Sequence, residues 1–343
     1  MSVTTEDIGE EAGGDGLSLG HLTESLQKAI SWKLSDPGIS ISELMPLEGG
    51  SSRLTFSFMA NSESGMDSKL VLRMDPPGVT RPGSLVTEAN LMLAALDAGA
   101  PVPRVIMTSD DESILGAPFV IMEFVEGISN PRSILRDPAL EKLRPNLAGM
   151  LGQALGKIHS IPLEAAPGLV QIDLVTQLRN QLDLLGEQRP VLELAMRVLE
   201  QTKPKTMGTT VVHGDFRNGN FIVANDGVRA IIDWELSHIG DPLEDLGWLC
   251  VRTWRFNGPG PVGGFGAYNQ LIFAYEHASG RVFDRVLLRW WELACTLRWA
   301  VMSLMQAQAF LQGTHRSLDK ALLGRRVCEV EWDILALLNS IKK

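Results

Sequence analysis

His213-Gly214-Asp215-Phe216-Arg217-Asn218-Gly219-Asn220 is a polar segment enclosed by two short apolar runs. Residues 211–212 are both valine, and residues 221–223 read Phe-Ile-Val. An apolar run, a polar segment and a second apolar run predict a strand, a loop and a strand. The loop carries Asp215 and Asn220, whose side-chain oxygens are potential proton acceptors or metal ligands.

A hairpin is expected directly after this loop. Asn225-Asp226-Gly227 is typical of a tight turn, and the chain then returns through Ala230-Ile231-Ile232 to Asp233. The residue before the first strand of a hairpin and the residue after the second lie at the same end, because the two strands run antiparallel. We therefore expect Asn220 and Asp233 side by side, with Asp215 just upstream.

These three side chains suit phosphoryl transfer from ATP. The reaction needs an oxygen that orients or takes the acceptor proton, and oxygen ligands for Mg²⁺. Asp and Asn residues more often only cap turns, and a single one would be read that way. Asp215, Asn220 and Asp233 in this order, between apolar strands, favour a catalytic site.

The pattern H-G-D-x4-N followed by I-D-W-E resembles the catalytic and metal-binding loops of the aminoglycoside phosphotransferase and choline kinase family. These are small-molecule kinases with a protein-kinase-like fold. The resemblance implies an α+β, bilobal structure with a small antiparallel β N-lobe, a larger mainly helical C-lobe and ATP between them. It implies Asp215 as catalytic base, Asn220 and Asp233 as Mg²⁺ ligands and His213 as a bracing residue. Arg217 is expected to steady the transferring phosphate or the loop.

The chain divides by composition into three parts. Residues 1–17 are acidic and rich in Gly and Ser, which predicts a disordered tail. Residues 18–128 read as the β-rich, nucleotide-binding N-lobe, after a helix that the leucine spacing predicts near its start. Residues 129–343 read as the C-lobe, with the catalytic loops and the acceptor-binding helices.

A phosphate-binding loop is expected at Gly49, Gly50, Ser51 and Ser52, since glycines let backbone N–H groups approach phosphates closely. The resembling kinases position the nucleotide there, although this loop lacks the full G-x-G-x-x-G of protein kinases.

The resemblance also assigns the rest of the nucleotide site. Arg73 ends a strand at the position of the cation that bridges the phosphates, and Glu88 lies at the position of its helix partner. Arg73 replaces the usual lysine there. Glu123 and Val125 fall where the backbone receives the adenine edge.

The acceptor is expected to meet an insert at 170–205, the C-terminal helices and a mobile Gly/Pro-rich flap at 256–265. Arg298 lies among apolar neighbours and needs an anionic partner, either Glu292, Asp245 or a substrate carboxylate or phosphate. Asp241-Pro242-Leu243-Glu244 predicts an N-cap and capping box for the next helix.

Three C-terminal segments resemble one branch of the family, the phosphotransferase-like domain fused to some acyl-CoA dehydrogenases. They are Leu297-Arg298-Trp299-Ala300, Gly324-Arg325-Arg326-Val327 and Glu329-Val330-Glu331. This resemblance covers about residues 25–340, so we expect no dehydrogenase domain within these residues. It points to hydroxylated acids or acyl groups as acceptors, which Arg255, Arg298 and the tryptophans would suit. An aminoglycoside-like acceptor, the best-known substrate of the family, is the alternative.

Composition agrees with a cytoplasmic enzyme. The chain has 343 residues, 45% hydrophobic and 21% charged, enough for a sizeable core. Its formal net charge of −10 disfavours nucleic acid as a partner, and no apolar run reaches the length needed to cross a membrane. Three dispersed cysteines indicate reduced thiols. The expected partner is a small molecule with a hydroxyl group.

Two other functions fit the motifs. A nucleotide-binding pseudokinase would share them, and Arg53 and Arg73 favour it, whereas the intact Asp215, Asn220 and Asp233 oppose it. A metal-dependent phosphohydrolase would need several His and Asp ligands, and the chain has 6 scattered histidines.

Overall fold

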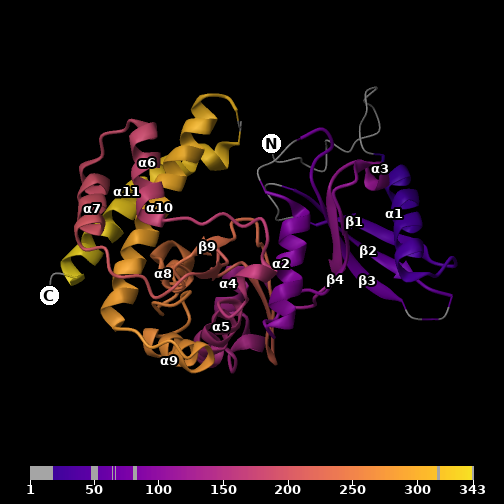
Figure 1. The fold of residues 1–343 in the computed structure, drawn as a ribbon, viewed down its shortest axis with the longest axis horizontal. Helices are drawn as coiled ribbons and strands as arrows, with labels where there is room; N and C mark the ends of the chain where they lie inside the picture. Colours follow the sequence, from indigo (N-terminus) through magenta and orange to yellow (C-terminus); the bar gives the residue numbers. More distant parts are fainter. Residues whose placement is uncertain are drawn as a thin grey trace. The chain divides into compact units, whose positions relative to one another are not determined.

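The computed structural model describes residues 18–47, 53–63, 65, 67–79, 83–314 and 317–341. The chain forms two compact units (Figure 1). The first comprises residues up to 93 together with 103–125, and the second comprises 94–102 and 126 onward. The predicted tail at 1–17 and the predicted phosphate loop at Gly49, Gly50, Ser51 and Ser52 lie outside the described residues.

The first unit is an antiparallel sheet with a helix packed on it. Strands run in the order β1-β2-β3-β5-β4, and their bounds are β1 Ser40–Pro46, β2 Leu54–Asn61, β3 Ser68–Met74, β4 Val105–Ser109 and β5 Phe119–Glu123. Helix α1 (Leu19–Leu34) buries Leu22, Leu26 and Ile30 in the same core as the sheet, which confirms the helix predicted from leucine spacing. A short helix, α3 (Glu112–Leu115), precedes β5.

Helix α2 (Leu85–Asp97) begins in the first unit and ends in the second. The second unit is mainly helical, as expected. Its helices are α4 Pro131–Arg136, α5 Arg144–Ile158, α6 Leu174–Leu185, α7 Pro190–Gln201, α8 Leu243–Cys250, α9 Tyr268–Ser279, α10 Arg285–Leu311 and α11 Leu318–Ile341. Two small sheets lie among them, β6 (Thr210–Val212) with β9 (His238–Gly240), and β7 (Phe221–Ala224) with β8 (Gly227–Ile231). The structure therefore has the predicted combination of a small antiparallel sheet and a larger helical part.

The β7–β8 hairpin has the predicted register. Phe221 pairs with Ile231, and the backbone N–H of Ile232 donates to the carbonyl of Asn220 at 3.0 Å. Asn220 and Asp233 therefore stand at the same end of the hairpin. Asp233 has a φ of +69°, a left-handed conformation that is uncommon for a residue other than glycine and that tends to occur at functional sites.

The predicted capping box of α8 is half wrong. Asp241 does accept a hydrogen bond through Oδ1 from the backbone N–H of Leu243, at 2.9 Å. The Glu244 side chain, however, turns toward His238 and Arg298 instead of returning to the cap. The half-buried Arg298 guanidinium and the buried His238 ring together attract the carboxylate more strongly than a single backbone N–H can.

In the part of the chain that the structure describes, no helix has both the length and the apolar character needed to cross a membrane.

Candidate active site

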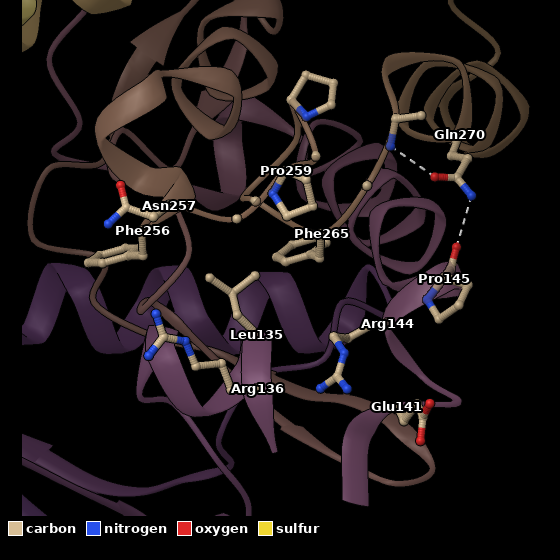
Figure 2. A pocket seen from close by; sticks show the side chains of 16 residues that line it. Leu135, Arg136, Glu141, Arg144, Pro145, Phe256, Asn257, Pro259, Phe265 and Gln270 are labelled. Atoms are coloured by element: carbon tan, nitrogen blue, oxygen red, sulfur yellow. Dashed lines mark hydrogen bonds between the residues drawn. The ribbon is translucent and has the colours of Figure 1, made fainter. Parts of the chain in front are cut away.

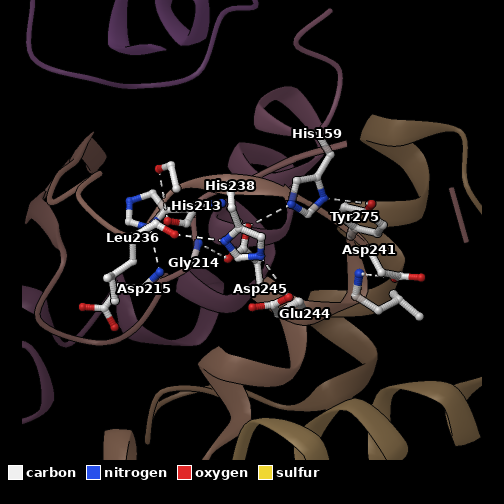
Figure 3. Close-up of polar contacts among 12 residues, drawn as sticks. His159, His213, Gly214, Asp215, Leu236, His238, Asp241, Glu244, Asp245 and Tyr275 are labelled. Atoms are coloured by element: carbon white, nitrogen blue, oxygen red, sulfur yellow. Dashed lines mark hydrogen bonds and ion pairs between the residues drawn. The ribbon is translucent and has the colours of Figure 1, made fainter. Parts of the chain in front are cut away.

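Asp245, in the first turn of α8, holds the backbone of the His-Gly-Asp loop. Its fully buried carboxylate accepts hydrogen bonds from the N–H groups of His213 at 2.7 Å and Gly214 at 2.9 Å (Figure 3). Gly214 has a φ of +81°, and a Cβ there would lie 2.2 Å from the carbonyl oxygen of Leu236. Only glycine fits this position. The conformation of the loop is therefore fixed by Gly214 and by the hydrogen bonds to Asp245 of α8.

His159 braces Asp245 in turn. It stands at the C-terminal end of α5, where its Nε2 lies 3.1 Å from Asp245 Oδ2 and its Nδ1 lies 3.0 Å from the Tyr275 hydroxyl. His159 is buried in the core behind the loop, so it acts as a packing residue. The hydrogen bonds from Tyr275 to His159, from His159 to Asp245 and from the loop backbone to Asp245 join α9, α5 and α8 behind the candidate site.

His213 is buried and neutral. Burial lowers its pKa from the ordinary value of 6.5, against the opposing effect of Asp245 and other nearby carboxylates. Its Nδ1 accepts from the N–H of Asp215 at 3.2 Å, so Nε2 carries the proton and donates to the Ile232 carbonyl at 3.2 Å. His213 thus links the loop to the end of β8, next to Asp233.

The Asp215 carboxylate is bound on both oxygens. Oδ1 accepts from Trp248 Nε1 at 2.7 Å, and Oδ2 accepts from Asn220 Nδ2 at 2.6 Å. Arg217 Nε lies 3.1 and 3.2 Å from the two oxygens, while its guanidinium rests 4.7 Å from the ring centroid of Trp254. Asp215 and Arg217 are thus brought together as the motif implied, and the carboxylate keeps 12% of its side chain exposed.

The orientation of Asn220 fits a metal ligand. Its amide nitrogen donates to the carboxylate and to the backbone carbonyl of Asp215. The amide oxygen therefore faces away from Asp215, at the end of the hairpin that also carries Asp233. An amide oxygen and a carboxylate are a donor pair suited to Mg²⁺.

Arg298 has a partner that the sequence did not suggest. Its Nη1 lies 2.9 Å from Glu244 Oε1, so neither Glu292 nor Asp245 nor a substrate is needed to neutralise it. Glu244 points from α8 toward α10 and also meets His238 Nε2, at 3.2 Å. Arg255, the other suggested substrate cation, pairs with the buried Glu292 at 2.8 Å.

His238 is expected to make the free energy of unfolding pH-dependent. Burial lowers its pKa, but Glu244 more than offsets this, so the pKa lies above the ordinary 6.5. Such a group stabilises the fold fully below pH 6.5 and loses this contribution as the pH rises through its raised pKa. Chemical denaturation of wild type and His238→Gln from pH 5 to 9 should show a gap that is widest at acidic pH. A gap that widens toward alkaline pH would contradict the protonated His238–Glu244 pair.

In the first unit, Glu88 pairs with Arg53, a cation that the motif does not predict. Arg53 forms ion pairs with Asp75, at 3.0 Å, and with Glu88. All three side chains are buried. Arg73 lies on β3 opposite Thr55 and Val120, and its expected pairing with Glu88 stays a prediction.

The proposed adenine-binding segment ends the first unit. Glu123 is the last residue of β5, and its N–H donates to the Arg104 carbonyl at 2.9 Å. Val125 is the last residue of the unit. Their contact with a nucleotide stays a prediction.

A cavity of about 710 Å³ lies in the second unit, between the 256–267 loop and the segment from α4 to α5. Figure 2 shows the Arg136 side chain reaching toward the loop that carries Phe256. The Arg144 guanidinium turns away from this loop, and its Nη1 donates to the carbonyls of Ile134 and Asp137. Both walls adjoin the catalytic loop. Asn218 Nδ2 donates to the Gly263 carbonyl at 2.9 Å, and a Cβ on Gly219 would lie 3.2 Å from Pro131 at the start of α4.

The 256–265 segment that was expected to form a flap is folded back on itself. Gly260 bridges to Gly264, and Val262 bridges to Gly266. The N–H of Gly263 also donates to the Leu249 carbonyl, so the segment is fastened to α8 as well as to Asn218.

Sequence reasoning missed Trp248, and it did not pair Arg53 with Glu88. Trp248 stands three residues after Asp245, so both side chains leave the same face of α8 toward the loop. This spacing was a usable signal. The cluster of Arg53, Asp75 and Glu88 brings together residues up to 35 positions apart, so no local sequence pattern predicts it.

Comparison with known proteins shows the family and the fold of the chain. A family model described as "Phosphotransferase enzyme family" (APH) matches residues 43–283. The chain is similar to acyl-CoA dehydrogenase family member 10 of Mus musculus, with 31% identity over 244 residues that cover 66% of this chain and 22% of the relative. The chain thus spans under a quarter of the length of that relative.

Two solved structures share the fold. A putative aminoglycoside phosphotransferase from Ralstonia eutropha superposes with a TM-score of 0.71 at 22% identity, covering 91% of this chain and 97% of that one. The aminoglycoside phosphotransferase APH(2″)-IIIa, solved with GDP and kanamycin, gives 0.61 at 18% identity, covering 90% and 98%. The family model covers well over half of the chain, so the protein belongs to the APH phosphotransferase family.

Proposed function

We propose that the protein is an ATP- and Mg²⁺-dependent kinase that transfers the γ-phosphate to a hydroxyl group of a small molecule. One observation carries the proposal. The Asp215 carboxylate and the Asn220 amide are bonded to each other in a loop braced by Asp245, at the hairpin end that also carries Asp233. This arrangement supports Asp215 as the base and Asn220 and Asp233 as the two oxygen ligands of the metal.

Each residue has a definite part in the proposed reaction. Asp215 orients the acceptor hydroxyl and takes its proton as the phosphoryl group transfers. Arg217 lies beside it with a fixed positive charge that can stabilise the transferring phosphoryl group. Asn220 and Asp233 would hold Mg²⁺, which when bound neutralises charge on the phosphate oxygens.

The nucleotide is assigned to the first unit. Arg73 and Glu88 are proposed to position the phosphates together with Gly49, Gly50, Ser51 and Ser52, and the backbone of Glu123 and Val125 to receive the adenine. The support comes from the family membership and from nucleotide complexes among the structures that share the fold.

A pseudokinase is the second candidate, and Arg53 favours it. The buried pair of Arg53 with Glu88 occupies a carboxylate that active kinases use to position a phosphate-binding cation. A protein of this kind would bind nucleotide without transferring phosphate.

The acceptor is proposed to be a metabolite with an anionic group instead of a polycationic aminoglycoside. Around the catalytic loop, Glu244, Asp245 and Glu292 already pair with cations or histidines of the protein. The neighbouring cavity is lined by Arg136 and Arg144 and by a single acidic residue, Glu141. Arg144 donates to two backbone carbonyls, so Arg136 is the cation offered to an acceptor. Such walls favour an anion over ammonium groups.

The test is a coupled assay of ATP consumption with Mg²⁺ against hydroxy acids, amino alcohols and aminoglycosides. Turnover that requires both Mg²⁺ and a hydroxy acid supports the proposal. A nucleotide-induced thermal shift with no turnover on any acceptor would favour the pseudokinase. Turnover confined to aminoglycosides would overturn the anionic acceptor but keep the kinase.

Arg136→Ala is expected to raise the KM for the anionic acceptor about tenfold and leave kcat and the KM for ATP unchanged. The reason is that Arg136 lines the cavity yet lies outside the catalytic loop. Arg132→Ala is the matched control, because Arg132 is an exposed residue of the same helix that does not line the cavity. Equal effects of the two substitutions would remove the cavity from the acceptor site.

A further inference from the structure

We propose that Trp248 is a positioning residue for the base, an inference that rests on the proposed kinase function. Its indole N–H donates to Asp215 Oδ1 at 2.7 Å, the shortest contact to that oxygen that the described residues make. A hydrogen bond to a carboxylate is shorter and stronger than one between neutral groups. Trp248 therefore fixes one oxygen of Asp215, while Asn220 fixes the other.

The indole is itself held rigidly. Trp248 is 1% exposed, and its ring centroid lies 5.2 Å from that of Trp254. The Arg298 guanidinium stands 4.7 Å from the Trp248 ring centroid and is anchored by Glu244. A donor enclosed in this way cannot follow the carboxylate if the carboxylate rotates, so it sets the plane of Asp215.

Helix α8 thereby serves the loop in two ways. Asp245 fixes the backbone of His213 and Gly214, and Trp248, one turn later, fixes the side chain of Asp215. Loss of the Trp248 donor would leave the loop backbone in place and free the carboxylate to rotate. Transfer depends on the alignment of base and hydroxyl, so the rate should fall while nucleotide affinity stays the same.

Trp248→Phe keeps an aromatic ring under Arg298 and removes only the N–H donor. We expect kcat to fall about tenfold, both for the acceptor found by the panel and for Mg²⁺-ATP hydrolysis to water, with the KM for ATP within about twofold of wild type. The control is Trp290→Phe, which also removes a buried indole hydrogen bond, to the Thr202 hydroxyl at 3.0 Å. Equal losses of kcat in the two variants would overturn the proposal.

A second readout does not depend on turnover. The indole ¹H–¹⁵N signal that disappears in Trp248→Phe should move in Asp215→Asn, because its acceptor loses its charge, while the Trp290 signal stays in place. A Trp248 signal that does not move in Asp215→Asn would overturn the hydrogen bond and the positioning role, but not the kinase function. A wild type that turns over no acceptor and hydrolyses no ATP would overturn the kinase function, and with it the positioning role, even if the signal moves.

Discussion

Asp215→Asn is expected to lose about a thousandfold in turnover while keeping its fold and its affinity for nucleotide. The amide is nearly isosteric with the carboxylate, and its oxygen can still accept from Trp248. It cannot take a proton from a hydroxyl, and removal of a general base costs on the order of 10²–10⁴ in rate. Steady-state kinetics over a range of Mg²⁺-ATP concentrations measures the turnover and the KM for ATP, and circular dichroism measures the fold.

The matched control is Asp226→Asn. Asp226 is an exposed carboxylate in the β7–β8 turn that pairs with Arg229 at 3.0 Å. An exposed ion pair of this kind contributes little to stability, so this variant should behave as wild type. Near-wild-type turnover in Asp215→Asn would remove the base from the mechanism. A comparable loss in Asp226→Asn would show that the hairpin and not the carboxylate carries the effect.

Asp245→Asn is expected to lower the free energy of unfolding by about 3 kcal/mol, since it leaves buried donors without a charged acceptor. The carboxylate accepts from two backbone N–H groups and faces His159, and an amide cannot reproduce all of these contacts. Urea denaturation at pH 7 measures the loss. Asp241→Asn, one turn earlier and half-buried, is the control and should lose much less.

The free energies of unfolding of the wild type and Asp245→Asn should approach each other in acid. Burial raises the pKa of Asp245, but the hydrogen bond and charge of His159 outweigh this, so the pKa lies below the ordinary 3.8. A carboxyl group of this kind stabilises the fold fully above pH 3.8 and loses that contribution as the pH falls through its lowered pKa. The wild type should therefore keep its advantage over Asp245→Asn above pH 3.8. An advantage that vanishes between pH 7 and pH 5 would contradict the ionised, hydrogen-bonded Asp245.

The bilobal fold could be predicted from the family resemblance, and the loop and its hairpin could be predicted because their signals are local. Asn225-Asp226-Gly227 sets the turn of the hairpin, and the apolar runs on either side set its strands. The turn and strand pattern alone therefore placed Asn220 and Asp233 at one end. The α1 helix was equally accessible, because its buried leucines recur at helical spacing.

The partners of charged side chains could not be predicted in this way. Arg298 pairs with Glu244 and Arg255 with Glu292 because α8, the segment after it and α10 pack against one another. The sequence shows that Arg298 needs an anion, but which carboxylate it meets depends on how two helices are rotated about their axes. These pairings redirect the search for acceptor-binding cations from Arg255 and Arg298 to the cavity around Arg136.

The most direct measurement is ³¹P NMR of Mg²⁺-ATP with the acceptor panel, wild type beside Asp215→Asn. A kinase predicts a new phosphomonoester resonance with equimolar ADP in the wild-type sample, and neither in the variant. ADP with inorganic phosphate but no phosphoester on any acceptor would indicate hydrolysis instead of transfer. A phosphoester formed equally by both proteins would contradict the role of Asp215. ATP that binds to the wild type but is not consumed would contradict the kinase function.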